Sequence, residues 1–114
     1  MKKGIFTLAF VVFSTICFAQ NGYKKIYNYD EFNKDWALVK TISNTFGFID
    51  KNGSVVVQPI YTKINKFEFN SEKYALVKNI AGAYGFIDRN GKEIIPAIYW
   101  KKNEAIEKLK TVKI

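Results

Sequence analysis

Two aspartates follow nearly identical segments of this sequence, and a pair of carboxylates can do chemistry. Asp50 follows Phe-Gly-Phe-Ile at 46–49, and Asp88 follows Tyr-Gly-Phe-Ile at 84–87. Glycoside hydrolysis needs two carboxyl groups that face each other across a sugar, with one of them acting as the acid. A carboxylate-dependent hydrolase of envelope glycans, with Asp50 and Asp88 as the pair, is therefore one hypothesis.

Turn chemistry gives both aspartates a simpler role. Asp-Lys-Asn-Gly at 50–53 and Asp-Arg-Asn-Gly at 88–91 fit a type I turn closed by a left-handed glycine, in which the first Asp accepts hydrogen bonds from the turn backbone. A calcium loop is disfavoured, because no acidic residue follows Asn52 at the required spacing. We therefore predict no catalytic, cofactor-binding or metal-ligating residue, and no enzymatic activity.

The composition removes other kinds of site. The sequence has no histidine, and its single cysteine is Cys17 near the amino terminus. This excludes the usual Cys/His metal sites, Ser-His and Cys-His dyads and an intrachain disulfide. The chain has 114 residues, of which 48% are apolar and 17% aromatic, and this predicts one small folded domain.

Aromatic residues interleaved with lysines give a second candidate surface. They could stack bases or sugars beside positive charge, or they could be core rings with lysines passing between them. We favour the core interpretation for the rings. The rings and lysines are Tyr23, Tyr27, Tyr29, Tyr61, Phe67, Phe69 and Tyr99, with Lys24, Lys25, Lys63, Lys66, Lys101 and Lys102.

The segment 1–19 is typical of a secretory signal peptide. Two lysines at 2–3 precede an apolar run over 5–18, and Ala19 supplies a small residue for cleavage. The run is shorter than the roughly 20 residues that cross a bilayer, so no integral membrane segment is expected after cleavage. Ile16 before Cys17 argues against a lipoprotein signal. We predict an exported protein, periplasmic or secreted, whose formal charge falls from +8 to +6 when the two leader lysines are removed.

The rest of the chain, 20–114, is one domain built from an internal repeat. The segment 36–40, Trp-Ala-Leu-Val-Lys, returns as Tyr-Ala-Leu-Val-Lys at 74–78, with the same 38-residue offset as the two aspartates. The predicted units are 23–60 and 61–98, followed by a partial unit at 99–114. Periods of this length are typical of stacked supersecondary units.

Each unit is predicted to be mainly β. In the first unit, strands are expected at 36–41, 45–50 and 54–57, joined by antiparallel hairpins. Both faces of these strands are apolar, which indicates that they are covered on two sides or belong to a strongly curled sheet. Gly47 and Gly85 lie between aromatic residues, where we expect a ring or a neighbouring backbone to approach closely.

The proline-containing connections are less well defined. Pro59 and Pro96 lack a backbone donor, so each should end strand pairing or lie on an edge. For 26–33 and 60–69 the pattern does not choose between strand and helix. After Asn103, which we expect to cap a helix, Ala105, Leu109 and Val112 share one helical face. A short C-terminal helix that caps the array is predicted, with a strand at 108–114 as the alternative.

These motifs resemble those of the WG (or KWG) repeat family. The resemblance rests on Ala-Leu-Val-Lys at 75–78, Tyr-Gly-Phe-Ile-Asp at 84–88, Asn-Gly at 90–91 and Ile-Ile-Pro-Ala-Ile-Tyr at 94–99. Phe46 and Tyr84 stand where the family has its tryptophan. The resemblance implies an antiparallel β-repeat of bacterial proteins, often exported, that binds or assembles and has no established catalysis. The leader is similar to export signals of Bacteroidetes.

The preferred function is a non-catalytic, exported binding or assembly module for a protein or an envelope polymer. Self-association through exposed strand edges is also expected, because two units are few for a stable array. The alternatives are the envelope glycan hydrolase and a basic module for extracellular nucleic acid, which we regard as an unlikely partner. The sequence predicts no binding residue for any of these partners.

Overall fold

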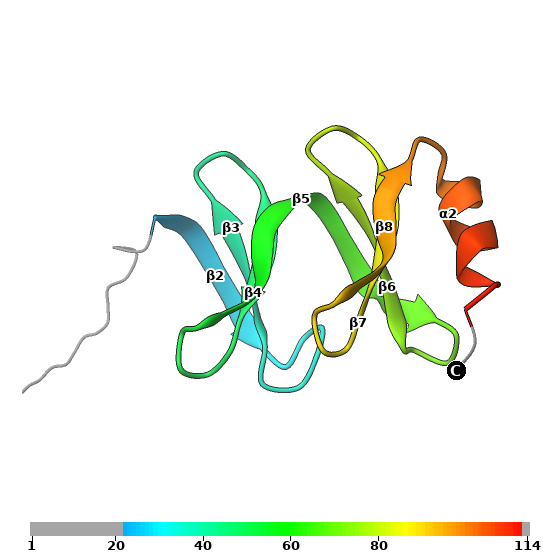
Figure 1. Cartoon of the computed structure of the whole chain (residues 1–114). Helices are drawn as coiled ribbons and strands as arrows, with labels where there is room; N and C mark the ends of the chain where they lie inside the picture. Colours follow the sequence, from blue (N-terminus) through cyan, green and yellow to red (C-terminus); the bar gives the residue numbers. More distant parts are fainter. Residues whose placement is uncertain (1–21, 113–114) are drawn as a thin grey trace, which may run out of the picture.

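The computed structural model describes residues 22–112, and the predicted signal peptide at 1–19 lies outside them. Within these residues the chain forms one antiparallel sheet, in which every strand pairs with the next strand along the chain, followed by a short helix (Figure 1). The mainly β fold class is confirmed. The elements are β2 (Tyr23–Tyr29), β3 (Ala37–Thr41), β4 (Phe46–Ile49), β5 (Val55–Phe69), β6 (Tyr74–Asn79), β7 (Tyr84–Asp88), β8 (Glu93–Tyr99) and α2 (Lys102–Leu109).

Strand pairing repeats with the period of the sequence. Val39 is paired with Gly47 between β3 and β4, and Val77 is paired with Gly85 between β6 and β7. β2 pairs with β3 in the register with which the second half of β5 pairs with β6. The sequence did not assign these two outer segments, so each unit has one strand more than the three predicted.

The close approach expected at the two strand glycines is confirmed, and a backbone makes it. A Cβ on Gly47 would lie 2.4 Å from the carbonyl oxygen of Val57, and a Cβ on Gly85 would lie 2.4 Å from that of Ile95. Real Cβ atoms essentially never come so near, so only glycine fits. The backbone that approaches belongs to the neighbouring antiparallel strand, β5 in the first unit and β8 in the second, at the register shift opposite each glycine.

The two prolines do not end their strands, which corrects one of the two expectations for them. β5 runs through Pro59 as far as Phe69, and β8 runs through Pro96 as far as Tyr99. Pro59 lies at the register shift opposite Gly47, in the first half of β5, which pairs with β4. From Tyr61 onward, β5 pairs with β6. The missing donor is therefore tolerated, because these residues pair on one side only within the part of the chain described.

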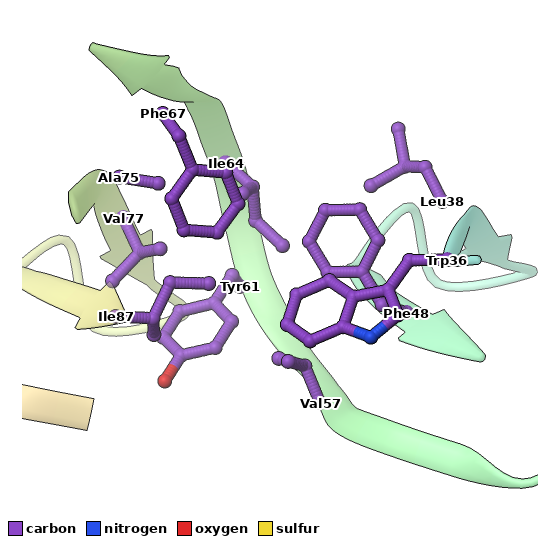
Figure 2. Close-up of a cluster of buried hydrophobic side chains, with 10 residues drawn as sticks. All are labelled: Trp36, Leu38, Phe48, Val57, Tyr61, Ile64, Phe67, Ala75, Val77 and Ile87. Atoms are coloured by element: carbon purple, nitrogen blue, oxygen red, sulfur yellow. The ribbon is translucent and has the colours of Figure 1, made fainter. Parts of the chain in front are cut away.

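The two faces of the second unit are both covered, as the apolar pattern predicted. On one face, Ala75, Val77 and Ile87 pack against Trp36, Leu38 and other residues of the first unit. Figure 2 shows this cluster on both sides of the β5 ribbon. On the opposite face, Leu76 and Phe86 pack against the helix and its neighbours. The units are thus stacked in series, with β5 belonging to both.

The predicted helix is present and covers the exposed end of the second unit, at the right of Figure 1. Ala105 and Leu109 are buried in its contact with β7 and β8, and Val112 packs beside them. The expected cap at Asn103 is wrong, because the helix begins at Lys102 after Lys101, which makes no side-chain capping bond. Packing of its apolar face, and not a side-chain cap, stabilises this helix.

The alternative of a strand at 108–114 is not found for residues 108–112, and 113–114 lie outside the described part. Among the described residues, no helix is long and apolar enough to cross a membrane.

Candidate functional site

The side chain of each repeated aspartate accepts hydrogen bonds from the backbone of its own turn. Asp50 Oδ1 accepts hydrogen bonds of 2.9 Å from the backbone N–H groups of Asn52 and Ser54. Asp88 Oδ1 accepts 2.9 Å bonds from those of Asn90 and Lys92. Both turns close on a glycine with positive φ, +81° at Gly53 and +85° at Gly91. The predicted turn is therefore confirmed, and it accounts for both acids.

The hypothesis of a carboxylate pair gains no geometric support from these turns. One aspartate belongs to the β4–β5 hairpin and the other to the β7–β8 hairpin, and each carboxylate is held by backbone donors of its own loop. Over residues 22–112, no three side chains of the types that bind metal ions cluster together.

The candidate stacking surface is dispersed into the core, as favoured from the sequence. Tyr61 and Phe67 are 3% and 5% exposed. The five other rings, partly buried, pack against one of the three apolar clusters: Tyr23, Tyr27, Tyr29, Phe69 and Tyr99. All seven rings therefore contribute to the apolar clusters.

A buried tyrosine ties the middle of the sheet to its last strand. The Tyr61 hydroxyl donates a hydrogen bond to Glu93 Oε1, and Glu93 Oε2 accepts one of 3.3 Å from the Ala97 N–H. Burial, followed by this hydrogen bond and the negative charge of Glu93, raises the pKa of Tyr61 well above its ordinary value. Tyr61 is therefore a neutral, structural donor. In the first unit Val55 stands where the second has Glu93, and Pro59 where it has Ala97.

An arginine in the β7–β8 turn of the second unit contacts the loop between β2 and β3 of the first unit. The Arg89 guanidinium donates to the carbonyl oxygens of Glu72 (2.9 Å) and Phe32 (3.2 Å) and to Asn33 Oδ1 (2.9 Å). Its charge also lies 4.4 Å from the centroid of the Phe67 ring. These contacts reach the loop between β2 and β3, so they orient one unit on the other.

Neither the core nor the turns account for a set of large apolar residues exposed in both units. Ile42 and Ile80 are 75% and 68% exposed, and Ile60 and Ile98 are 47% and 61% exposed. The members of each pair are separated by one repeat period. With Trp100, which is 67% exposed, they form what we call the isoleucine row.

The isoleucine row follows one edge of the molecule. Ile42 lies in the β3–β4 turn and Ile80 in the β6–β7 turn, both at the top of Figure 1. Ile60 and Ile98 precede tyrosines that are paired with the first residues after these turns, Phe46 and Tyr84. Ile60 within β5 and Ile98 near the end of β8 therefore lie next to residues that pair with the starts of β4 and β7, and the loop that carries Trp100 follows β8.

Positive charge accompanies this row. The segments 40–46, 60–64, 78–84 and 97–102 contain five lysines and no acidic residue. Sequence reasoning missed the row, because it used the repeat to locate core positions only. The available signal was an isoleucine at the tip of both polar turns, where neither turn geometry nor a core requires one.

The comparisons with known proteins agree with the resemblance seen in the sequence. A family model described as WG containing repeat matches residues 46–79 and 84–99. No curated protein and no solved structure matches the chain.

Proposed function

Residues 46–99 of this chain belong to the WG-containing repeats, and from this premise we propose that the protein is a non-catalytic binding module that captures a protein partner along the isoleucine row. The leader at 1–19 supports a site of action outside the cytoplasm, in the periplasm or beyond it.

The observation that carries the proposal is the recurrence of exposed isoleucines at equivalent positions of both units. An isolated exposed apolar residue is ordinary on a protein surface, whereas contiguous exposed patches mark interaction sites. Repeat proteins present such equivalent side chains along one edge, so that a partner meets the same contact once per unit. Here the contact is an isoleucine pair, and Trp100 adds the residue type that is most enriched in binding hot spots.

The charges beside the row define the chemistry of the partner. Lys40 and Lys78 each lie two positions before a turn isoleucine, and Lys101 follows Trp100. A partner surface with apolar side chains at its centre and carboxylates around them would complement both features. Charge of this kind speeds association, and the desolvated apolar centre provides most of the affinity.

Affinity capture from an envelope extract, followed by titration of the captured protein, tests this function. The variants Ile80→Ser and Ile98→Ser should each weaken binding about tenfold, since burial of an isoleucine contributes about 1.5 kcal/mol or more. The matched control is Ile26→Ser, because Ile26 is 44% exposed but has no exposed counterpart in the other unit. Equal affinity of the row variants and the control would contradict the proposal.

A second copy of the chain is the alternative occupant. Light scattering across a range of protein concentrations distinguishes the two cases. A dimer that Ile80→Ser disrupts would assign the row to self-association and would contradict a heterologous partner.

A further inference from the structure

Three lysines surround a small cavity between the sheet of the second unit and the start of α2. The cavity has a volume of about 50 Å³. Its polar lining consists of Lys63 and Asn65 of β5, Lys78 of β6, Tyr84 of β7 and Lys102 of α2, and Leu76 contributes an apolar wall. Within residues 22–112, no carboxylate lines the cavity, and none of the three lysines makes an ion pair. We call this site the lysine pocket.

Strand pairing forces two of these charges together. Lys63 and Lys78 are direct partners in the register of β5 and β6, and Lys78 is in turn paired with Tyr84 of β7. Like charges directly opposite each other on neighbouring strands destabilise a sheet. The third charge, Lys102, is brought to the same cavity by the helix that covers this face. The fold therefore brings three lysines to the lining of one cavity that, among residues 22–112, no carboxylate lines.

The first unit has an equivalent lysine pair, and each of its two lysines lies near an aromatic ring. Lys25 and Lys40 are paired between β2 and β3, as Lys63 and Lys78 are in the second unit. The Lys25 Nζ lies 4.3 Å from the centroid of the Tyr27 ring, and the Lys40 Nζ lies 5.7 Å from that of the Phe46 ring. Each lysine of the first unit thus has an aromatic face as its neighbour.

Around the second lysine pair, polar residues replace apolar or aromatic ones at two positions, and at a third the ring is kept and gains a hydroxyl group. Asn65 occupies the position that Tyr27 has in the first unit, so Lys63 lacks the ring that Lys25 has. Tyr84 replaces Phe46 and adds a hydroxyl group, and Lys78 lies 5.4 Å from its ring centroid. Lys102 stands one repeat period after Ile64, which belongs to the apolar cluster between the units. All three exchanges favour a polar, anionic occupant.

We propose that the lysine pocket of the second unit binds an oxyanion, a phosphate or carboxylate group, held by Lys63, Lys78 and Lys102. Three ammonium groups can donate charge-assisted hydrogen bonds to its oxygens, and the Asn65 amide and Tyr84 hydroxyl add neutral donors. Pockets for whole small-molecule ligands are typically several times larger, about 300 Å³ or more. The pocket therefore takes one anionic group of a larger molecule. This site adjoins the isoleucine row, since Lys63, Lys78 and Lys102 are among the five lysines that accompany the row, but it takes a different ligand from the proposed protein partner.

Calorimetric titration of the purified protein with inorganic phosphate and, separately, with galacturonate tests the proposal. Saturable binding at one site is expected for at least one of the two probes. Lys63→Gln and Lys102→Gln should each weaken it about tenfold, because a hydrogen bond to a charged group contributes about 1.5 kcal/mol or more. Lys25→Gln is the matched control in the first unit and should leave binding unchanged. Asn65→Tyr, which copies the first unit, should fill the pocket and abolish binding.

The response to the two probes identifies the source of the anion. Binding of phosphate alone assigns the pocket to a phosphoryl group, and binding of galacturonate alone assigns it to a sugar carboxylate. The proposal is overturned if neither probe binds saturably, or if Lys25→Gln weakens binding as much as Lys63→Gln. Lys102 is exposed at the first turn of α2, so its variant keeps the test valid should Asn65→Tyr fail to fold. Loss of protein capture in the isoleucine variants would not affect these titrations, so the two proposals fail independently.

Discussion

The first and second units share a backbone and differ in what surrounds it. Both have a strand glycine pressed against a crossing carbonyl oxygen, the same Asp-to-Gly turn and the same strand registers. They differ at Lys51 and Arg89 in that turn. Lys51 pairs with Asp35 at 3.2 Å inside its own unit, whereas Arg89 holds loops of both units. The residues that agree build the unit, and the exchange of Lys51 for Arg89 adds a contact between the two units.

The same contrast holds at the outer face of each unit. The face of the first unit that carries Leu38 and Phe48 is covered by the second unit, and the corresponding face of the second is covered by α2. A helix shorter than a whole unit covers less of this face, and the lysine pocket lies beside its first residue, Lys102. The second unit therefore has Asn65, Tyr84 and Lys102 where one repeat period earlier the chain has Tyr27, Phe46 and Ile64.

Substitution of the strand glycines should have the largest effect, and the same effect in both units. Gly47→Ala and Gly85→Ala each bring a Cβ to 2.4 Å from a backbone oxygen, so the strands must separate. We expect a loss of about 4 kcal/mol in the free energy of unfolding, measured in urea. Gly53→Ala is the control: it has positive φ but open space, and should cost about 1 kcal/mol. Equal losses in all three variants would show that crowding does not fix these glycines.

Removal of the helix contact should be the next largest effect, and it should be confined to the second unit. Leu109 is 2% exposed and packs in one cluster with Leu76 and Phe86. Leu109→Ala should therefore cost about 3 kcal/mol in unfolding free energy. Lys108→Ala, an exposed change on the same helix, should cost less than about 0.5 kcal/mol. Hydrogen exchange should speed up in β7 and β8 and remain slow in β3. Uniform acceleration in all strands would contradict a local capping role.

Substitution of the basic residues in the two turns should have a smaller effect on stability, and the effect should differ between the two units. Arg89→Ala removes three hydrogen bonds, two of them to the first unit, and a ring contact within the second unit, and should lower the unfolding free energy by about 1–2 kcal/mol. Lys51→Ala removes one exposed ion pair and should leave the urea midpoint unchanged. Equal midpoints for the two variants would remove the distinction between an inter-unit and an intra-unit contact.

The tyrosine that joins β5 to β8 should give the smallest effect at neutral pH and a distinctive one in alkali. Tyr61→Phe loses a hydrogen bond to Glu93, which costs about 1 kcal/mol. The pKa of Tyr61 is raised above 10, so the folded protein keeps a proton that the unfolded chain releases. Its stabilisation is complete below pH 10 and declines as pH rises toward the folded pKa.

The difference in unfolding free energy between the wild type and Tyr61→Phe should therefore shrink as the pH rises above 10. A gap that stays constant across that range would contradict the raised pKa.

The sequence predicted those features that local chemistry fixes. The two hairpin turns follow from Asp and Gly at fixed positions, the strand glycines from their aromatic neighbours, and the helix from the spacing of Ala105 and Leu109. The long strand β5 was not predicted, because its pairing changes partner at Tyr61 and a proline lies within it. Its strand character depends on tertiary pairing.

The candidate sites were not predicted, for a related reason. Exposure of Ile42 and Ile80, and the meeting of Lys63 with Lys102 across a cavity, depend on how the units stack. An alignment of the two units would have revealed the exchange of Tyr27 for Asn65, but not that these positions line a cavity.

The most direct test of the difference between the units is an NMR titration of the uniformly ¹⁵N-labelled protein with inorganic phosphate and, separately, with galacturonate. Amide shifts should change, for at least one probe, around Lys63, Asn65, Lys78, Tyr84 and Lys102, and should saturate together. The equivalent residues of the first unit, Lys25, Tyr27, Lys40 and Phe46, should remain unchanged. Changes of equal size in both units, or none in either, would contradict the account that the second unit alone carries an anion site.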